Sequence, residues 1–150
     1  MERKHTILIV DDEATLRAVF ADLMSREGYR CLTAANAIDA LQMIETNVIK
    51  FDLLVSDIRM PGGLNGLDLA NRMRELQPDV AILLITGYAR EMDEAKTRGY
   101  RVLEKPFRHF DLEAAVAEEL RKRGSRQATD KDATDKDASV TSIEEARKAR

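Results

Sequence analysis

Three short apolar runs, each rich in branched side chains, set the strongest limit on how this chain can fold. They cover residues 7–10 (ILIV), 51–55 (FDLLV) and 80–85 (VAILLI). Short runs that lack regular polar alternation are typical of strands buried on both faces, as in a parallel sheet that is covered by helices. The sequence therefore favours an α/β fold.

Amphipathic helices are predicted between these runs, because apolar residues there recur at helical spacing. The order of five strand–helix units predicts a doubly wound open sheet of parallel strands, in which a site lies outside the carboxyl ends of the strands. The expected helices cover residues 16–24, 38–44, 67–76, 90–98 and 112–120, and two weaker strands cover 29–33 and 101–103.

The composition speaks against two classes of protein, those that bind nucleic acid through its phosphates and those that span a membrane. The chain has 24 Lys plus Arg against 27 Asp plus Glu, whereas a domain that binds nucleic acid by neutralising phosphates would be clearly basic. Charged residues make up 34%, too many for a membrane-spanning chain. The single cysteine, Cys31, forms no internal disulfide, and the run 7–10 ends at two aspartates rather than continuing as a secretory signal. We therefore expect a cytoplasmic protein with no direct contact to nucleic acid or membrane.

The composition changes near Gly124. Residues 128–132 and 133–137 repeat the sequence ATDKD, in which no apolar side chain is larger than alanine. Such a segment cannot offset the entropy cost of ordering by burying apolar surface. We predict one domain over residues 1–123 and a flexible tail over 124–150, with a short helix beginning at about Ser142.

Polar side chains follow the predicted strands at the ends where parallel strands meet. Asp11 and Asp12 follow the first strand, Asp57 the third and Lys105 the fifth, while Thr86 ends the fourth. Three carboxylates within about 5 Å of one another repel by about 3 kcal/mol per pair at an effective dielectric near 20. A divalent cation relieves this repulsion, and oxygen-only ligands favour Mg²⁺, with Mn²⁺ as a substitute.

A carboxylate, a divalent cation, a hydroxyl and an ammonium group together suit phosphoryl transfer. Asp57 is the candidate nucleophile, Lys105 the group that neutralises phosphoryl oxygens, and Thr86 a hydrogen-bond donor. Simpler roles exist for each residue taken alone: a helix cap for the acidic pair or for Thr86, a turn residue for Asp57, and a solvated charge for Lys105. Their joint position at one edge favours the phosphoryl site.

The segments ILIVDDE, LLVSDIRMP, ILLITGYA and RVLEKPF resemble the receiver domain of two-component response regulators, over about residues 5–121. The resemblance implies a flavodoxin-like (βα)5 fold with strand order 2-1-3-4-5. It also implies that Asp57 accepts a phosphoryl group from a histidine kinase, and that Thr86 and Lys105 are the switch and phosphate-contacting residues. The Lys105–Pro106 bond is expected to be cis.

The resemblance further implies a metal site made by Asp11, Asp12 and Asp57 with the backbone carbonyl of Arg59. Arg59 and Tyr88 flank the expected phosphate position, where they either tune hydrolysis or are simply a solvated arginine and a half-buried tyrosine.

The chain departs from the family pattern in three places, one of which is Gly87, where the family usually carries alanine. Between Pro61 and Gly66 the sequence GGLN is one residue longer than the commonest receiver loop. Val102 stands where many receivers carry Tyr or Phe, and it is too small and stiff to act as a swinging aromatic switch. We therefore expect the phosphorylation signal over residues 86–98.

The predicted function is a stand-alone phosphoacceptor switch that is not an enzyme beyond its own phosphorylation and dephosphorylation. The expected partners are a sensor histidine kinase, a hybrid kinase or a phosphotransfer protein, and a downstream protein target, and a homodimer stays open. Two alternatives remain. An aspartyl-phosphate hydrolase of the haloacid-dehalogenase type would carry Asp-x-Asp after the first strand, where this chain has Asp-Asp-Glu. The other alternative is a receiver-like interaction module that works without phosphorylation.

Overall fold

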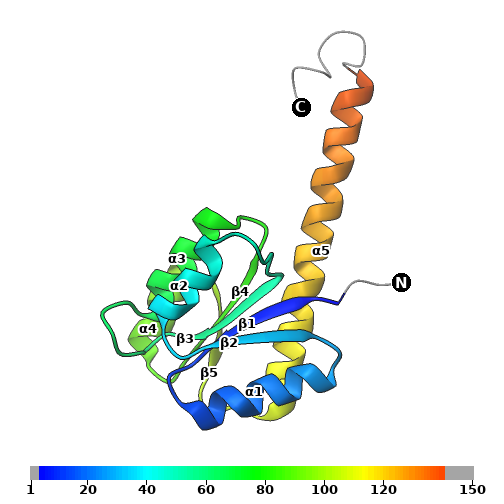
Figure 1. The fold of residues 1–150 in the computed structure, drawn as a ribbon. Helices are drawn as coiled ribbons and strands as arrows, with labels where there is room; N and C mark the ends of the chain where they lie inside the picture. The colour runs from blue at the N-terminus through cyan, green and yellow to red at the C-terminus, as the bar shows by residue number, and fades with distance from the viewer. Residues whose placement is uncertain (1–3, 141–150) are drawn as a thin grey trace.

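The computed structural model describes residues 4–140, and side chains over residues 4–126. It contains a five-stranded parallel sheet in the order β2-β1-β3-β4-β5, which confirms the predicted topology (Figure 1). The strands are β1 (Thr6–Val10), β2 (Arg30–Ala34), β3 (Leu53–Asp57), β4 (Ala81–Thr86) and β5 (Arg101–Glu104). The helices are α1 (Ala14–Arg26), α2 (Ala37–Glu45), α3 (Gly66–Leu76), α4 (Ala89–Thr97) and α5 (His109–Val140).

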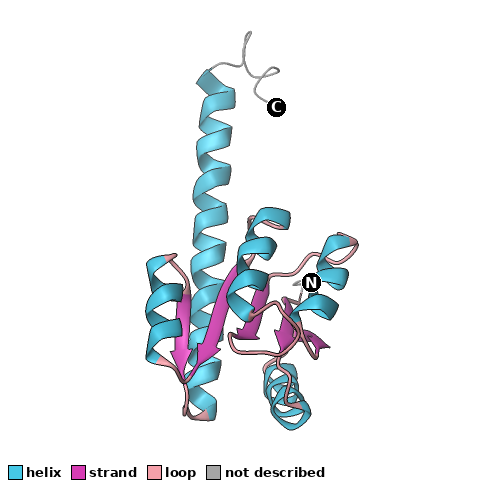
Figure 2. Cartoon of the chain, turned by 90° about the vertical axis from the view of Figure 1, so that its left-hand side faces the viewer, coloured by secondary structure: helices cyan, strands magenta, loops and turns pink. Residues whose placement is uncertain are grey.

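Helices cover both faces of the sheet (Figures 1 and 2). Leu8 and Val10 of β1 pack on one face with residues of α2, α3 and α4, whereas Ile7 and Ile9 pack on the other face with residues of α1 and α5. Every residue of β1, β3 and β4 is buried. Burial on both faces explains why these strands are nearly continuous apolar runs in the sequence.

The third strand lies two residues further along the chain than predicted. The apolar pattern indicates 51–55, but β3 runs to Asp57, because Ser56 pairs with Val10 and Asp57 pairs with Ile85 in the parallel ladders. Backbone pairing does not depend on apolar side chains, so the pattern misses these polar positions. Asp57 is therefore the last residue of the strand rather than a loop residue.

The last helix is longer than predicted. The sequence predicts a flexible tail from residue 124, whereas α5 continues to Val140 without a break at Gly124 and extends past the sheet (Figure 1). A glycine costs a helix interior only about 1 kcal/mol, and the absence of large apolar residues excludes core packing rather than helical backbone. The division of the chain after residue 123 stays a prediction, and the helix predicted from Ser142 lies outside the described residues.

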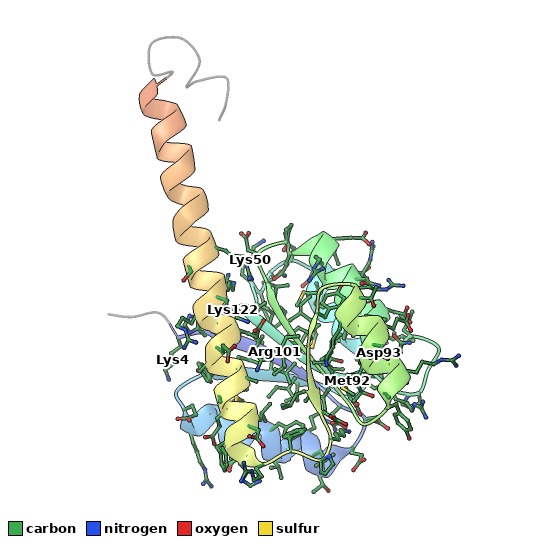
Figure 3. All side chains as sticks on the ribbon, turned by 180° about the vertical axis from the view of Figure 1, so that it is seen from behind. Lys4, Lys50, Met92, Asp93, Arg101 and Lys122 are labelled. Atoms are coloured by element: carbon green, nitrogen blue, oxygen red, sulfur yellow. The ribbon has the colours of Figure 1, made fainter. Side chains whose placement is uncertain are left out.

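Ion pairs hold α5 against the sheet. Arg101 of β5 contacts Glu118 and Glu119 of α5 at 2.9 and 3.3 Å, and Lys122 contacts the same two carboxylates (Figure 3). Arg123, the next residue, has its Nη1 3.0 Å from Oδ1 of the buried Asp52. The contacts of Arg101 and Arg123 join the helix to the amino edge of the sheet, whereas those of Lys122 lie within α5. Over residues 4–140, no helix combines the length and the apolar character needed to cross a bilayer.

Candidate functional site

Three aspartates come together at the carboxyl edge of the sheet. Asp57 ends β3, and Asp11 and Asp12 directly follow β1. One carboxylate oxygen from each residue lies within 4.8 Å of the others. Asp11 and Asp57 are buried, whereas Asp12 is exposed. The structure thus brings together the acidic residues that the strand order predicts should meet.

Asp11 has a buried oxygen that lacks a partner. Its Oδ1 accepts a hydrogen bond from the backbone N–H of Glu13 at 2.8 Å, but its Oδ2 is, among the residues described with side chains, a buried oxygen with no hydrogen-bond partner. Burial raises the pKa of Asp11, and the bond from Glu13 offsets part of that rise. A buried acceptor without a partner is costly, so this oxygen is suited to an added ligand such as a hard cation.

Asp57 lies between a cation and the other carboxylates. Lys105 follows β5, and its Nζ is 3.3 Å from Asp57 Oδ2. The pKa of Asp57 is raised to about 6. Burial is the largest cause, the Lys105 ammonium opposes it, and the charge of Asp11 adds to it. A cation bound beside these groups would favour the ionised, nucleophilic form of Asp57. The Lys105–Pro106 bond is cis, as predicted.

Gly66, which the sequence analysis treated only as the end of a loop, is required by the packing next to Asp57. A Cβ atom at this position would collide with the backbone carbonyl of Asp57. The Gly66 N–H also donates to the carbonyl of Ile58 at 2.7 Å, so the start of α3 rests on the backbone beside the site. The signal for this helix start is the capping box formed by Asn65 and Asp68 on either side of Gly66.

Thr86 is at the predicted strand end, but its hydroxyl is already engaged. Thr86 Oγ1 donates a hydrogen bond of 2.6 Å to Glu91 Oε1, in the first turn of α4. Arg59 Nε donates to the other oxygen of Glu91 at 3.1 Å, and its guanidinium lies 3.5 Å from the centre of the Tyr88 ring. The sequence does not single out Glu91, since an acidic residue in the first turn of a helix is common and indicates no particular contact.

An open cavity of about 550 Å³ lies beside Asp57, Thr86 and Lys105. It combines carboxylates with two cationic side chains, so it can hold a metal ion and a phosphoryl oxygen side by side. The roles of the individual residues, including the Arg59 carbonyl as a metal ligand, stay predictions. The lining residues are Asp12, Glu13, Asp57, Arg59, Thr86, Gly87, Tyr88 and Lys105.

Comparison with known sequences places the chain among signalling domains. Residues 7–117 match the response regulator receiver domain. The phosphate regulon transcriptional regulatory protein PhoB of Pseudomonas aeruginosa is 36% identical over 126 residues, which are 79% of this chain and 53% of PhoB. Sporulation initiation phosphotransferase F of Bacillus subtilis is 31% identical over 114 residues, 73% of this chain and 89% of that protein. The chain thus spans about half the length of PhoB and most of the phosphotransferase.

Comparison with solved structures agrees with these sequence matches. A CheY-like response regulator receiver domain protein from Methanospirillum hungatei JF-1 superposes with a TM-score of 0.76 at 28% identity, covering 83% of this chain and 99% of that one. Sequence and fold thus agree with the resemblance carried by the four motifs at the strand ends. This chain belongs to the family of response regulator receiver domains of two-component systems.

Proposed function

We propose that this chain accepts a phosphoryl group on Asp57 from a histidine kinase, with Mg²⁺ bound beside the acceptor. The observation that carries the proposal is the convergence of three carboxylates within 4.8 Å, with Lys105 Nζ at 3.3 Å from Asp57 Oδ2. This arrangement supplies a nucleophile, a set of metal ligands and a counter-charge in one cavity.

The geometry supports a role for each residue. A carboxylate oxygen of Asp57 attacks phosphorus, a new O–P bond forms, and the bond from phosphorus to the donor's imidazole nitrogen breaks with its electron pair leaving on that nitrogen. The ammonium of Lys105 is placed to neutralise charge on the phosphoryl oxygens. The Thr86 hydroxyl, at the wall of the same cavity, is a donor for one of those oxygens.

The metal ligands in this proposal are Asp11, Asp12 and Asp57, with the backbone carbonyl of Arg59. The unpartnered Oδ2 of Asp11 and the oxygen-only donor set support Mg²⁺, with Mn²⁺ as a substitute. A bound cation would neutralise the carboxylates and polarise the phosphoryl oxygens.

The proposed donor is a sensor histidine kinase, a hybrid kinase or a phosphotransfer protein, and the proposed location is the cytoplasm. The output passes to a downstream protein target or, in a relay, the phosphoryl group itself passes onward. The match to a relative whose name is that of a phosphotransferase, and most of whose length the chain spans, supports the relay. The proposed chemistry is limited to the chain's own phosphorylation and dephosphorylation. A phosphorylation-independent module would not need Lys105 beside Asp57.

Acetyl phosphate tests the proposal without a kinase. Incubation of the full chain with acetyl phosphate and Mg²⁺ should release acetate and add one phosphoryl group, measured by intact mass. Asp57→Asn should remain unlabelled. Asp22→Asn, which changes an exposed acid paired with Arg26 on α1, should label like the wild type. Equal labelling of Asp57→Asn would refute the acceptor, and labelling that survives excess chelator would remove the metal from the proposal.

A further inference from the structure

Glu91 takes two hydrogen bonds from two different parts of the site. Its Oε1 accepts from the Thr86 hydroxyl at 2.6 Å, and its Oε2 accepts from Arg59 Nε at 3.1 Å. Thr86 ends β4 and Arg59 follows β3, so one carboxylate of α4 links the ends of two neighbouring strands. Thr86 and Arg59 both line the cavity beside Asp57.

The contact with Glu91 occupies the single proton of the Thr86 hydroxyl group. A hydroxyl group has one proton, so it cannot donate to Glu91 and to a phosphoryl oxygen at the same time. The Thr86 oxygen also accepts the backbone N–H of Tyr88 at 3.2 Å, and the side chain is buried. The hydroxyl is thus held between the N–H of the loop and the carboxylate of α4.

Arg59, an exposed residue that lines the same cavity, is held in the same way. Its guanidinium is paired with Glu91 and lies 3.5 Å from the centre of the Tyr88 ring, whose residue is half exposed. The ion pair and the ring contact act together, because both favour the same position of the Arg59 guanidinium. Release of Glu91 would therefore free a cation and a hydroxyl donor in one step.

We propose that Glu91 is a positioning residue: it holds the Thr86 hydroxyl and the Arg59 guanidinium in the unphosphorylated chain, and a phosphoryl group on Asp57 takes over these donors. The second half of this inference rests on the proposed function, and the first half does not. The exchange is chemically matched, since Glu91 and a phosphoryl group are both anionic oxygen acceptors, and the phosphoryl group carries more charge. Glu91 therefore opposes activation, and its side chain lies within the segment 86–98 where the signal is expected.

The first experiment needs no phosphate. Nuclear magnetic resonance signals of the Arg59 Nε–H and the Tyr88 amide are compared among the wild-type chain, Glu91→Ala and Glu94→Ala. Glu94 is the matched control, because it lies on the same helix and pairs with Arg98 at 3.8 Å. Both signals should move in Glu91→Ala and stay in Glu94→Ala. Unmoved signals in Glu91→Ala would overturn the inference.

The second experiment measures the affinity of the full chain for beryllofluoride, a phosphoryl mimic, in the presence of Mg²⁺. Removing one charge-assisted competitor should tighten binding about tenfold in Glu91→Ala. The affinity of Glu91→Gln should lie between those of the wild type and Glu91→Ala, because the amide oxygen still accepts from Thr86 but carries no charge to pair with Arg59. Glu94→Ala should bind like the wild type.

A double variant tests whether Glu91 acts through Thr86. In a Thr86→Val background no hydroxyl remains to be released, whereas Arg59 still is, so the gain from Glu91→Ala should be clearly smaller than in the wild-type background. Unchanged or weakened binding in Glu91→Ala would refute the exchange, as would a full gain in the Thr86→Val background. A wild-type chain that fails to bind the mimic with Mg²⁺ would instead count against the proposed function, while the phosphate-free signals still decide the first half.

Discussion

Two buried aspartates at opposite edges of the sheet have very different surroundings. Asp52, at the amino edge, is 1% exposed, with Oδ1 3.0 Å from Arg123 Nη1 and Oδ2 2.7 Å from the Thr6 N–H that donates to it. Asp11, at the carboxyl edge, is also 1% exposed, but its Oδ2 has no hydrogen-bond partner, and the charges that act on it come from Lys105 and from the like-charged Asp12 and Glu13.

Equal burial therefore has opposite effects on stability at the two edges. A buried carboxylate is stable only when a counter-charge and hydrogen bonds replace the water that it loses. Asp52 has both, so the amino edge fastens α5 to the sheet. Asp11 and Asp57 are gathered with like charge, which the Lys105 ammonium beside Asp57 offsets only in part, as is typical of sites where stability is given up for function.

The largest expected effect is at the amino edge. Arg123→Ala should lower the free energy of unfolding by about 3 kcal/mol, because it leaves the buried Asp52 carboxylate without its counter-charge. Urea unfolding measures this loss. Arg121→Ala, two residues earlier on an exposed position of α5, should change stability by less than about 0.5 kcal/mol. Similar losses in both variants would show that the ion pair does not fasten the helix.

At the carboxyl edge, Asp12→Ala should weaken Mg²⁺ binding by at least about tenfold, since it removes one of three carboxylates from the proposed site. Titration calorimetry on the unphosphorylated chain measures the affinity. Asp22→Ala removes an exposed acid of α1 and should leave the affinity unchanged. An unchanged affinity in Asp12→Ala would take Asp12 out of the metal site.

Replacing aspartate by asparagine should change the free energy of unfolding in opposite directions at the two edges. Without metal, Asp11→Asn should raise the free energy of unfolding by about 1 kcal/mol, because it removes a charge from a cluster of like charges. Asp52→Asn should lower it, because it removes the partner of Arg123. Saturating Mg²⁺ should reverse the order for Asp11, since only the wild type keeps the full ligand set and gains from binding. Thermal unfolding with and without Mg²⁺ checks all three outcomes, and destabilisation of metal-free Asp11→Asn would break the comparison.

The smallest effect is expected from removal of the residues after Gly124. A chain truncated after Gly124 keeps Arg123 and its contact with Asp52, and it should fold and accept phosphate from acetyl phosphate at the full-length rate. Labelling time courses of the two chains check this. A large loss of rate would mean that the repeat segment contributes to the site.

Much of the fold and part of the site follow from local patterns in the sequence. Strands buried on both faces appear as continuous apolar runs, so β1, β3 and β4 could be predicted along with the parallel sheet that they form. Because parallel strands end at one edge, the meeting of Asp11, Asp57 and Lys105 followed from their positions after those runs. The length of α5 could not be predicted, since a lack of apolar residues excludes packing but not helix formation.

Contacts between elements distant in the sequence were decided by the tertiary structure alone. Glu91 meets an arginine 32 residues earlier, and Asp52 meets Arg123 across the amino edge of the sheet. Gly66 is required only because α3 begins against the carbonyl of Asp57. Residue type and periodicity determine which face of a strand or helix is buried, and thus the sheet and its acidic edge. The pairing of charged side chains depends on how the helices pack over that sheet. No local sequence pattern predicts that packing.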